Sequence, residues 1–512
     1  MKKVLINVIL SDYMSLELGI AKYHEGYDVY FVGCDKSVRF CGFGNQRGDS
    51  CLCRLCSHAM KSEIDKLVKS DTDRFHYVST SSIMTDEMRE HARRSEFSYN
   101  STKELKSIVY KDVEIGFAAF SAYVSLTRNV MPTYNEKLKD YIDTILRYEV
   151  GLTDALDAYI DILKPDLIIF HNGRFPNVKP PYGLAKAKGI DYIATERIFT
   201  RKSSWSKAIM DNYVNGVPHS PSAIREKIEE KWNQLGEEKY EIGKLFFENH
   251  YHSKYAGDKA IYSKDQKLGL LPEGFDSSIR NIVIFNSSEH EYFSVSKERD
   301  AETLFPNQYI ALKTIFEHYK NDSTIHFYLR IHPQLAQVPY RSHTMLYDLK
   351  FDNVTIIPPS SPISSYTLME KAEKIIVFNS TMGLESAYWG KPVIILNTCF
   401  YLQYDVAYKP RTPDELYNLI DNRELERRAC PVENYYKPAI RLMGHVGEPV
   451  KYYNCKVIWK KLPIRKRPFA IYSSFKLFGS CYLYQMVYHL LKFLAKKGIL
   501  SKYSGKYMAQ TI

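Results

Sequence analysis

The stretch of sequence that decides the fold is residues 364–396, SSYTLMEKAEKIIVFNSTMGLESAYWGKPVIIL. Its pattern predicts a helix, a buried strand, a polar turn, a second helix and a second strand. The turn, 379–383, lies where a parallel strand ends and the next helix begins, and open α/β sheets bind ligands at that edge. Backbone N–H groups, two hydroxyls and the positive helix end suit a phosphate there, and Glu385, about one turn later, can accept hydrogen bonds from ribose hydroxyls. The segment therefore predicts half of a nucleotide-sugar site.

The run NSTMGLESAYWGKPVI resembles the donor-side motif of bacterial capsule and lipopolysaccharide polysaccharide-biosynthesis glycosyltransferases, a group that includes relatives of Kdo transferases. The matching residues are Ser380, Thr381, Gly383, Glu385, Trp389, Gly390, Lys391 and Pro392. The resemblance implies the GT-B architecture, an α/β fold with two facing Rossmann-like domains, and a reaction that requires no cofactor. Sugar epimerases share this architecture, so the motif leaves the reaction open.

The length of 512 residues indicates about two domains plus an appendage. A strand, a helix and a strand at 3–33 open a first Rossmann-like domain, expected at 1–265, with an α-rich insertion at 57–159. A second domain is expected at 280–425, followed by a return segment at 426–455. Because strands and helices alternate in both halves, we expect parallel sheets.

A second candidate group for the donor lies at the end of another buried strand. Arg330 and His332 are placed to contact the donor phosphates, although His332 can instead hydrogen-bond a loop. Residues 364–366 either lie beside the base and phosphates or form the N-cap and first turn of a helix. The His-Pro pair with a later Ser-Thr pair resembles transferases that use CMP-activated sugars, which favours a CMP- or UDP-linked donor. The predicted donor-binding residues are Arg330, His332, Ser364, Ser365, Tyr366, Asn379, Ser380, Thr381, Gly383 and Glu385.

The acceptor-side prediction rests on two polar segments that follow buried strands in the N-terminal half. Asn172, Gly173 and Arg174 follow one strand and Glu196 ends the next, and both segments resemble cleft motifs of the same group. An inverting sugar transfer needs a base for the acceptor hydroxyl, so Glu196 is the candidate catalytic residue. Asn172 and Arg174 would orient acceptor or donor. The alternative is a structural ion pair between Glu196 and Arg197.

Five of the nine cysteines fall within residues 34–56, and the spacing Cys53-x-x-Cys56 is that of a zinc half-site. Cys34 and Cys41 can supply the other two ligands, with Cys51 as a substitute, which gives a possible structural zinc. Reduced, metal-free cysteines are the alternative, and disulfides are not expected in the cytoplasm.

The C-terminal tail, residues 456–512, is strongly basic. It holds 12 Lys and Arg and no Asp or Glu, whereas the whole chain has a net charge of +11. Apolar residues follow helical spacing on one face of 481–497. A basic amphipathic helix suits an anionic membrane surface, where lipid-linked acceptors lie, and the alternative is a helix packed on the protein body. No recognition-module signature supports nucleic acid as a partner.

These features predict a cytoplasmic glycosyltransferase, peripheral on the inner face of the cell membrane, because the chain shows neither a signal peptide nor a spanning apolar run. It would move a sugar from a nucleotide-sugar donor to a surface polysaccharide (capsule or O-antigen) or to a lipid-linked glycan. The alternatives are a nucleotide-sugar epimerase on the same fold and a non-catalytic polysaccharide assembly factor.

Overall fold

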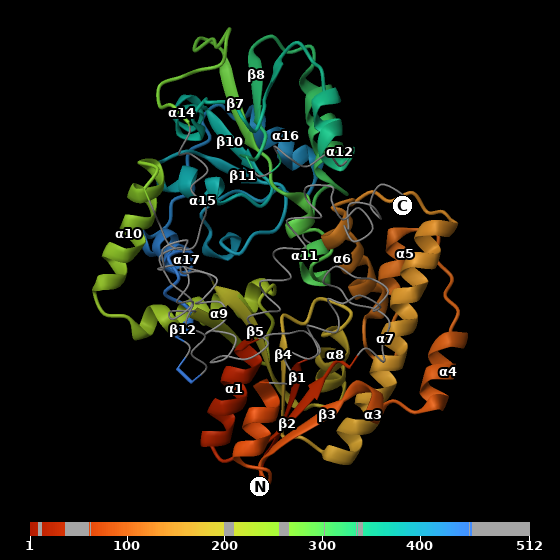
Figure 1. Cartoon of the computed structure of the whole chain (residues 1–512). Helices are drawn as coiled ribbons and strands as arrows, with labels where there is room; N and C mark the ends of the chain where they lie inside the picture. The colour runs from red at the N-terminus through yellow and green to blue at the C-terminus, as the bar shows by residue number, and fades with distance from the viewer. Residues whose placement is uncertain are drawn as a thin grey trace, which may run out of the picture. The chain divides into compact units, whose positions relative to one another are not determined.

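The computed structural model of the chain describes residues 1–8, 13–35, 61, 63–198, 209–254, 266–301, 303–333, 335, 341–449 and 451–452. These residues form two compact units (Figure 1). Among the described residues, the first consists of those within 1–127, 132–218 and 447–452, and the second of those within 128–131 and 219–446. Each unit is built on one sheet with helices on its faces.

The sheet of the first unit has the strand order β12-β6-β5-β4-β1-β2-β3. The strands β1 to β5 pair in parallel, and β6 and β12 are antiparallel additions at one edge. Five of the six residues of β1 are buried, as expected for a central strand covered on both faces. The strands are β1 (Lys3–Val8), β2 (Asp28–Gly33), β3 (Phe75–Ser79), β4 (Leu167–His171), β5 (Asp191–Ile198), β6 (Ile209–Val214) and β12 (Glu448–Pro449).

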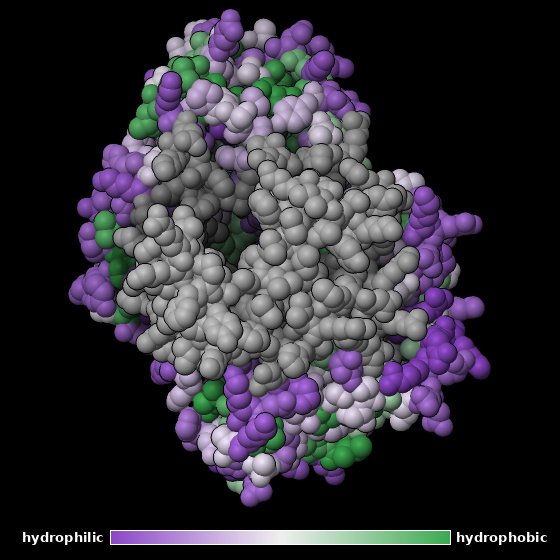
Figure 2. Space-filling model, viewed as in Figure 1, coloured by the Kyte–Doolittle hydropathy of each residue, from purple (hydrophilic) through white to green (hydrophobic). Residues whose placement is uncertain are grey.

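Helices account for most of the predicted insertion. They are α3 (Thr80–Ile83), α4 (Asp86–Arg94), α5 (Thr102–Ser107), α6 (Ile115–Thr127) and the long α7 (Glu136–Leu163). Hydrophilic side chains gather over α4 in Figure 2, in agreement with the absence of buried residues from this helix. This unit also contains the helices α1 (Tyr13–His24) and α8 (Lys179–Ala187).

One strand inside the predicted insertion belongs to the sheet instead. β3 pairs in parallel with β2, although the sequence at 57–159 was expected to be helical. Only Phe75 is buried in β3, because the strand lies at the sheet edge, so it lacks the apolar run that marks the central strands.

The sheet of the second unit is parallel throughout, in the order β11-β10-β7-β8-β9. Helices α12 and α16 pack on one face, and α14 and α15 pack on the other (Figure 1). The strands are β7 (Arg280–Phe285), β8 (Ile325–Arg330), β9 (Val354–Ile357), β10 (Lys374–Val377) and β11 (Val393–Ile395). The helices are α9 (Pro221–Gln234), α10 (Glu238–Tyr251), α11 (Lys297–Ala301), α12 (Gln308–Tyr319), α13 (Arg341–Thr344), α14 (Ser365–Lys371), α15 (Thr381–Tyr388), α16 (Pro413–Asp421) and α17 (Glu433–Leu442). The predicted α/β fold with two Rossmann-like domains is thus confirmed.

The strand order of the second unit places a topological switch point between β7 and β10. The chain leaves β7 toward α12 on one face and leaves β10 toward α15 on the other. In open α/β sheets, ligands bind beside the carboxyl ends of the strands at such a point.

Helices α9 and α10 correct the domain boundary expected at residue 265. Both belong to the second unit: α9 and α10 pack on α17, and α10 also contacts α15. The ring of Phe247 stacks on Tyr388 with centroids 3.8 Å apart. A side chain at Gly243 would overlap Tyr436 of α17. The charged helical pattern of 221–265 carries no information about which domain it packs on.

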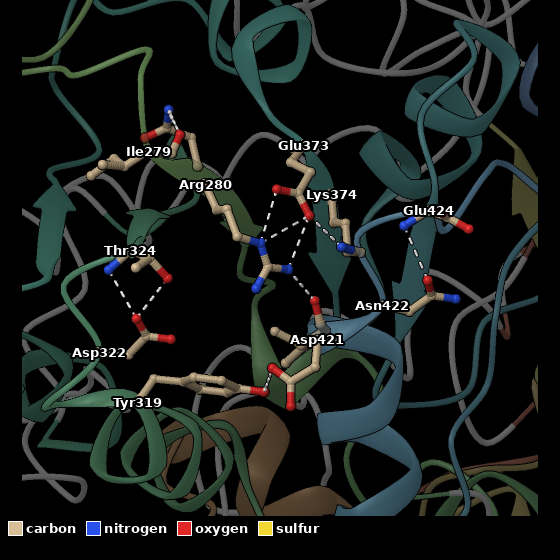
Figure 3. Close-up of polar contacts among 12 residues, drawn as sticks. Ile279, Arg280, Tyr319, Asp322, Thr324, Glu373, Lys374, Asp421, Asn422 and Glu424 are labelled. Atoms are coloured by element: carbon tan, nitrogen blue, oxygen red, sulfur yellow. Dashed lines mark hydrogen bonds and ion pairs between the residues drawn. The ribbon is translucent and has the colours of Figure 1, made fainter.

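The amino edge of the second sheet is held by an ionic network (Figure 3). The Arg280 guanidinium donates to Glu373 at 2.9–3.2 Å, and buried Lys374 donates to the same carboxylate. Burial opposes the ionisation of Glu373, yet these hydrogen bonds hold its pKa below the ordinary value. Since ligands bind at the opposite edge of such a sheet, we interpret this network as structural.

Two predictions fall largely outside the described residues. Of the proposed zinc ligands only Cys34 is described, half-buried just after β2; Cys41, Cys51, Cys53 and Cys56 lie outside, as does the basic tail. Both therefore stay predictions. Among the described helices, none combines the length and apolarity needed to cross a membrane.

Candidate active site

The turn between β10 and α15 lies at the carboxyl edge of the second sheet. Ser380 is the N-cap of α15, and its hydroxyl accepts the N–H of Met382 at 3.2 Å. Thr381 is the first residue of the helix and is partly exposed. The side-chain amide of Asn379 donates to the Thr398 carbonyl at 2.7 Å, which connects the turn to the segment after β11. Polar groups and a helix amino end therefore meet at the switch point, as the sequence predicts.

Gly383 is required by close packing. A Cβ atom at this position would lie 2.8 Å from the Val377 side chain and overlap the Tyr401 hydroxyl. That hydroxyl donates to the Ser380 carbonyl at 2.5 Å. Gly383 thus lets α15 approach β10 and makes room for the tyrosine that holds the turn.

Glu385 is buried, with 2% of its surface exposed, and one of its carboxylate oxygens has two partners. Its Oε2 atom accepts the Tyr366 hydroxyl and lies 3.3 Å from Nδ1 of His250 on α10. The other oxygen, Oε1, has no hydrogen bond within the described part of the chain. The structure therefore brings the predicted residues Tyr366 and Glu385 together and fixes the carboxylate through one oxygen only.

The two serines before Tyr366 hold the start of α14. Ser364 is the N-cap of α14, since its hydroxyl accepts the Tyr366 N–H at 3.2 Å. The Ser365 N–H donates to the Gln266 side chain at 2.9 Å. For Ser364, the geometry is that of the capping alternative.

Arg330, the last residue of β8, is almost completely buried. Its guanidinium donates to the carbonyls of Pro358 at 2.5 Å and Ser361 at 3.1 Å. Burial lowers its pKa to about 10. Arg330 thus stabilises the loop that leads to α14, and we interpret its role as structural support of the site.

His332 lies two residues beyond Arg330 and is partly exposed. Its backbone N–H donates to Oδ1 of Asn286, which follows β7, at 2.7 Å. This bond joins the loops after β7 and β8 at the predicted phosphate edge.

Lys391 of the donor-side motif caps a helix. Its amino group donates to the carbonyls of Glu370 and Ala372, both at 2.8 Å, at the end of α14. The motif lysine therefore holds α14 next to α15.

Sequence reasoning missed the loop that follows β7. Asn286, Ser287, Ser288 and Glu289 are all buried at the switch point. The Asn379 N–H donates to the Ser287 hydroxyl at 3.1 Å, so this loop contacts the predicted turn directly. The sequence does contain a signal for this loop, because its polar residues directly follow the apolar run 282–285. Polar residues follow apolar runs in the same way at the predicted site positions. His250 offered no such signal, since it lies 135 residues before Glu385.

Burial raises the pKa of Glu289 to about 8, although its carboxylate accepts the Gln308 N–H at 2.8 Å. Between pH 5 and 8 the folded protein therefore keeps a proton that the unfolded chain has released, so stability falls as pH rises. We expect the Glu289→Gln variant to lose this slope, which is at most about 1.4 kcal/mol per pH unit for one proton. Urea unfolding at pH 5.5, 6.5 and 7.5 measures it. The exposed Glu291→Gln variant is the control, and parallel pH profiles for wild type and Glu289→Gln would contradict the prediction.

At the carboxyl edge of the first sheet, the structure brings Asn172 and Glu196 together. The Asn172 side chain donates to Oε2 of Glu196, across the adjacent ends of β4 and β5. Asn172 and Gly173 have φ of 59° and 73°, which turns the chain sharply after β4. A Cβ at Gly173 would also lie 3.0 Å from the Phe170 ring.

Arg174 contacts other residues. Its Nε donates to the Ser121 hydroxyl on α6, and its guanidinium stands over the Phe175 ring at 5.1 Å. The predicted group of Asn172, Arg174 and Glu196 is therefore brought together in part. The Arg197 side chain lies outside the described part of the structure, so the ion-pair alternative stays open.

No protein-family model and no curated protein matches the chain. Among solved structures it is similar to KpsC of Thermosulfurimonas dismutans, a beta-Kdo 2,4 transferase, at 15% identity and a TM-score of 0.35 over 54% of this chain and 79% of that one. It is also similar to the UDP-N-acetylglucosamine 2-epimerase of Neisseria meningitidis bound to UDP-GlcNAc, at 11% identity and a TM-score of 0.23, over 86% and 94% of the two chains. A third similar structure is the glycosyltransferase SsfS6 of Streptomyces sp. SF2575 with thymidine diphosphate, at 9% identity and a TM-score of 0.21, over 87% and 96%.

Proposed function

We propose that the chain is a glycosyltransferase that moves a sugar from a nucleotide donor to a surface polysaccharide, such as capsule or O-antigen, or to a lipid-linked glycan. The observation that carries the proposal is the buried carboxylate of Glu385 at the switch point of a parallel sheet. One of its oxygens is fixed by Tyr366 and His250, and Oε1 is left to accept ligand hydroxyls.

The donor would lie along the carboxyl edge of the second unit. Its phosphates would meet the amino end of α15 at Ser380 and Thr381, where backbone N–H groups and the helix dipole favour negative charge. Its ribose would reach Glu385, about one turn along the same helix. CMP- and UDP-linked sugars are the favoured donors.

The acceptor would bind at the carboxyl edge of the first unit. Glu196 would remove the proton of the attacking hydroxyl, and the side-chain amide of Asn172 holds the Glu196 carboxylate in place. The basic tail, residues 456–512, would keep the enzyme at an anionic membrane surface where lipid-linked acceptors are found, and co-sedimentation with anionic vesicles tests this partner.

Nucleotide release, measured with and without a glycan acceptor, separates sugar transfer from two other functions. An epimerase would convert the nucleotide sugar with no acceptor, and an assembly factor would release no nucleotide. We expect nucleotide release from UDP- or CMP-linked sugars to depend on added glycan acceptor. Release or epimerisation at the same rate without acceptor contradicts transfer.

A further inference from the structure

The first residue of α12, Gln308, joins the two turns that form the switch point of the second sheet. It is 3% exposed, and its side chain contacts the loop after β7. Neither Gln308 nor its partners belongs to the motif that predicts the nucleotide site.

The side chain of Gln308 makes two hydrogen bonds to the backbone of one residue in the loop after β7. Its Oε1 accepts the Ser287 N–H at 3.0 Å, and its Nε2 donates to the Ser287 carbonyl at 2.8 Å. The backbone of Ser287 is thereby paired as it would be in a sheet, although Ser287 itself lies beyond the end of β7. Both residues are buried, so water cannot replace these bonds without a rearrangement.

The same network extends to the turn after β10. The Ser287 hydroxyl accepts the Asn379 N–H at 3.1 Å, one residue before the N-cap of α15. At its other end, the Gln308 N–H donates to Glu289 at 2.8 Å. A continuous path of hydrogen bonds, buried from Glu289 to Ser287 and part-buried at Asn379, therefore runs from Glu289 through Gln308 and Ser287 to Asn379.

We propose that Gln308 is a positioning residue for the phosphate end of the nucleotide: it sets the distance between the β7 loop and the β10 turn. The inference rests on the proposed function and assigns Gln308 no contact with ligand. Without the amide, Ser287 keeps a buried N–H and a buried carbonyl with no partner, which is unfavourable enough to displace the loop. Because Ser287 holds Asn379, the phosphate end of the site would move with it.

The test compares nucleotide affinities by calorimetry with UDP and CMP. The Gln308→Met variant, similar in volume but apolar at its end, should bind the better of the two nucleotides about tenfold more weakly than wild type. Ser287→Ala keeps the Gln308 bonds to the backbone and loses only the link to Asn379, so it should show a similar loss. In the double variant the loss should be smaller than the product of the two single losses, since both act through one path.

Asn307→Ala is the matched control for damage to the helix. Asn307 is the N-cap of α12 and accepts the Ile310 N–H at 2.9 Å, and no hydrogen bond joins it to Ser287 in the described structure. It should lower the melting temperature and leave the nucleotide Kd unchanged. Wild-type affinity in Gln308→Met and in Ser287→Ala, or an equal loss in Asn307→Ala, overturns the inference and leaves the proposed function intact. Failure of wild type to bind any nucleotide overturns both.

Discussion

The Glu196→Gln variant is expected to slow sugar transfer by about 10²- to 10⁴-fold while its nucleotide affinity stays at the wild-type value. The substitution keeps an oxygen that can accept the Asn172 amide, so the local structure is preserved and only the basic oxygen is lost. Nucleotide binding is unaffected because the residues proposed to hold the donor belong to the second unit, whereas Glu196 lies on β5 of the first. Acceptor-dependent release of the nucleotide, followed at saturating donor, measures the rate.

A variant of Asn172 helps to decide whether Glu196 is a catalytic base or a structural carboxylate. Asn172→Gly tolerates the positive φ of 59° and removes only the amide that orients Glu196. We expect a loss of about tenfold in turnover, smaller than that of Glu196→Gln, because the base is still present. If Glu196 instead forms a structural ion pair with Arg197, Glu196→Gln lowers the free energy of unfolding and leaves turnover normal. That outcome removes Glu196 from the mechanism.

The central strands of both sheets are predictable from sequence because each is buried on both faces and forms a continuous apolar run. The buried segments 282–285 and 375–377 show this most clearly. Strands at or next to the sheet edge lack this signal. β3 buries only Phe75, and β6 contains Asp211 and Asn212, so neither looks like a strand of a parallel sheet.

The site is predictable where one segment carries both the strand end and the helix start. Residues 379–385 do so, and the structure places them at the switch point. Residues that contact the site from a distant segment are not predictable in this way. His250 reaches Glu385 from α10, and Gln308 reaches Ser287 from α12, and both contacts depend on helix packing that a single sequence does not encode locally.

Burial also changes the interpretation of charged residues. Arg330 at a strand end was predicted to contact phosphate, but its guanidinium donates to two backbone carbonyls. Lys391 in the donor-side motif donates to the last carbonyls of α14. A motif of this kind contains residues that support a site by packing and residues that would contact a ligand. Sequence alone does not distinguish these two kinds of residue.

The Glu385→Ala variant is expected to lose about half or more of the stabilisation that a nucleotide gives to the wild-type protein. At a concentration about 100 times the wild-type Kd, a nucleotide raises the free energy of unfolding by about 2.7 kcal/mol. Hydrogen bonds to a charged group contribute about 1.5–3 kcal/mol, which corresponds to a Kd roughly 10 to 100 times higher without Glu385. The remaining stabilisation would then be about 0.4–1.4 kcal/mol. Thermal and urea unfolding with CMP, UDP, GDP and no nucleotide measure these values.

A ligand that lacks the ribose hydroxyls tests whether Glu385 acts through direct contact. If Oε1 accepts those hydroxyls, the 2′,3′-dideoxy form of the best nucleotide should bind wild type as weakly as the ribonucleotide binds Glu385→Ala. The variant itself should not distinguish the two ligands. Tyr366→Phe is the matched control, because it removes a hydroxyl from Oε2 and leaves Oε1 in place; it should weaken binding less and still discriminate. Equal discrimination by wild type and Glu385→Ala would mean that Glu385 only joins α10 to α15, and the ribose would have to be recognised elsewhere.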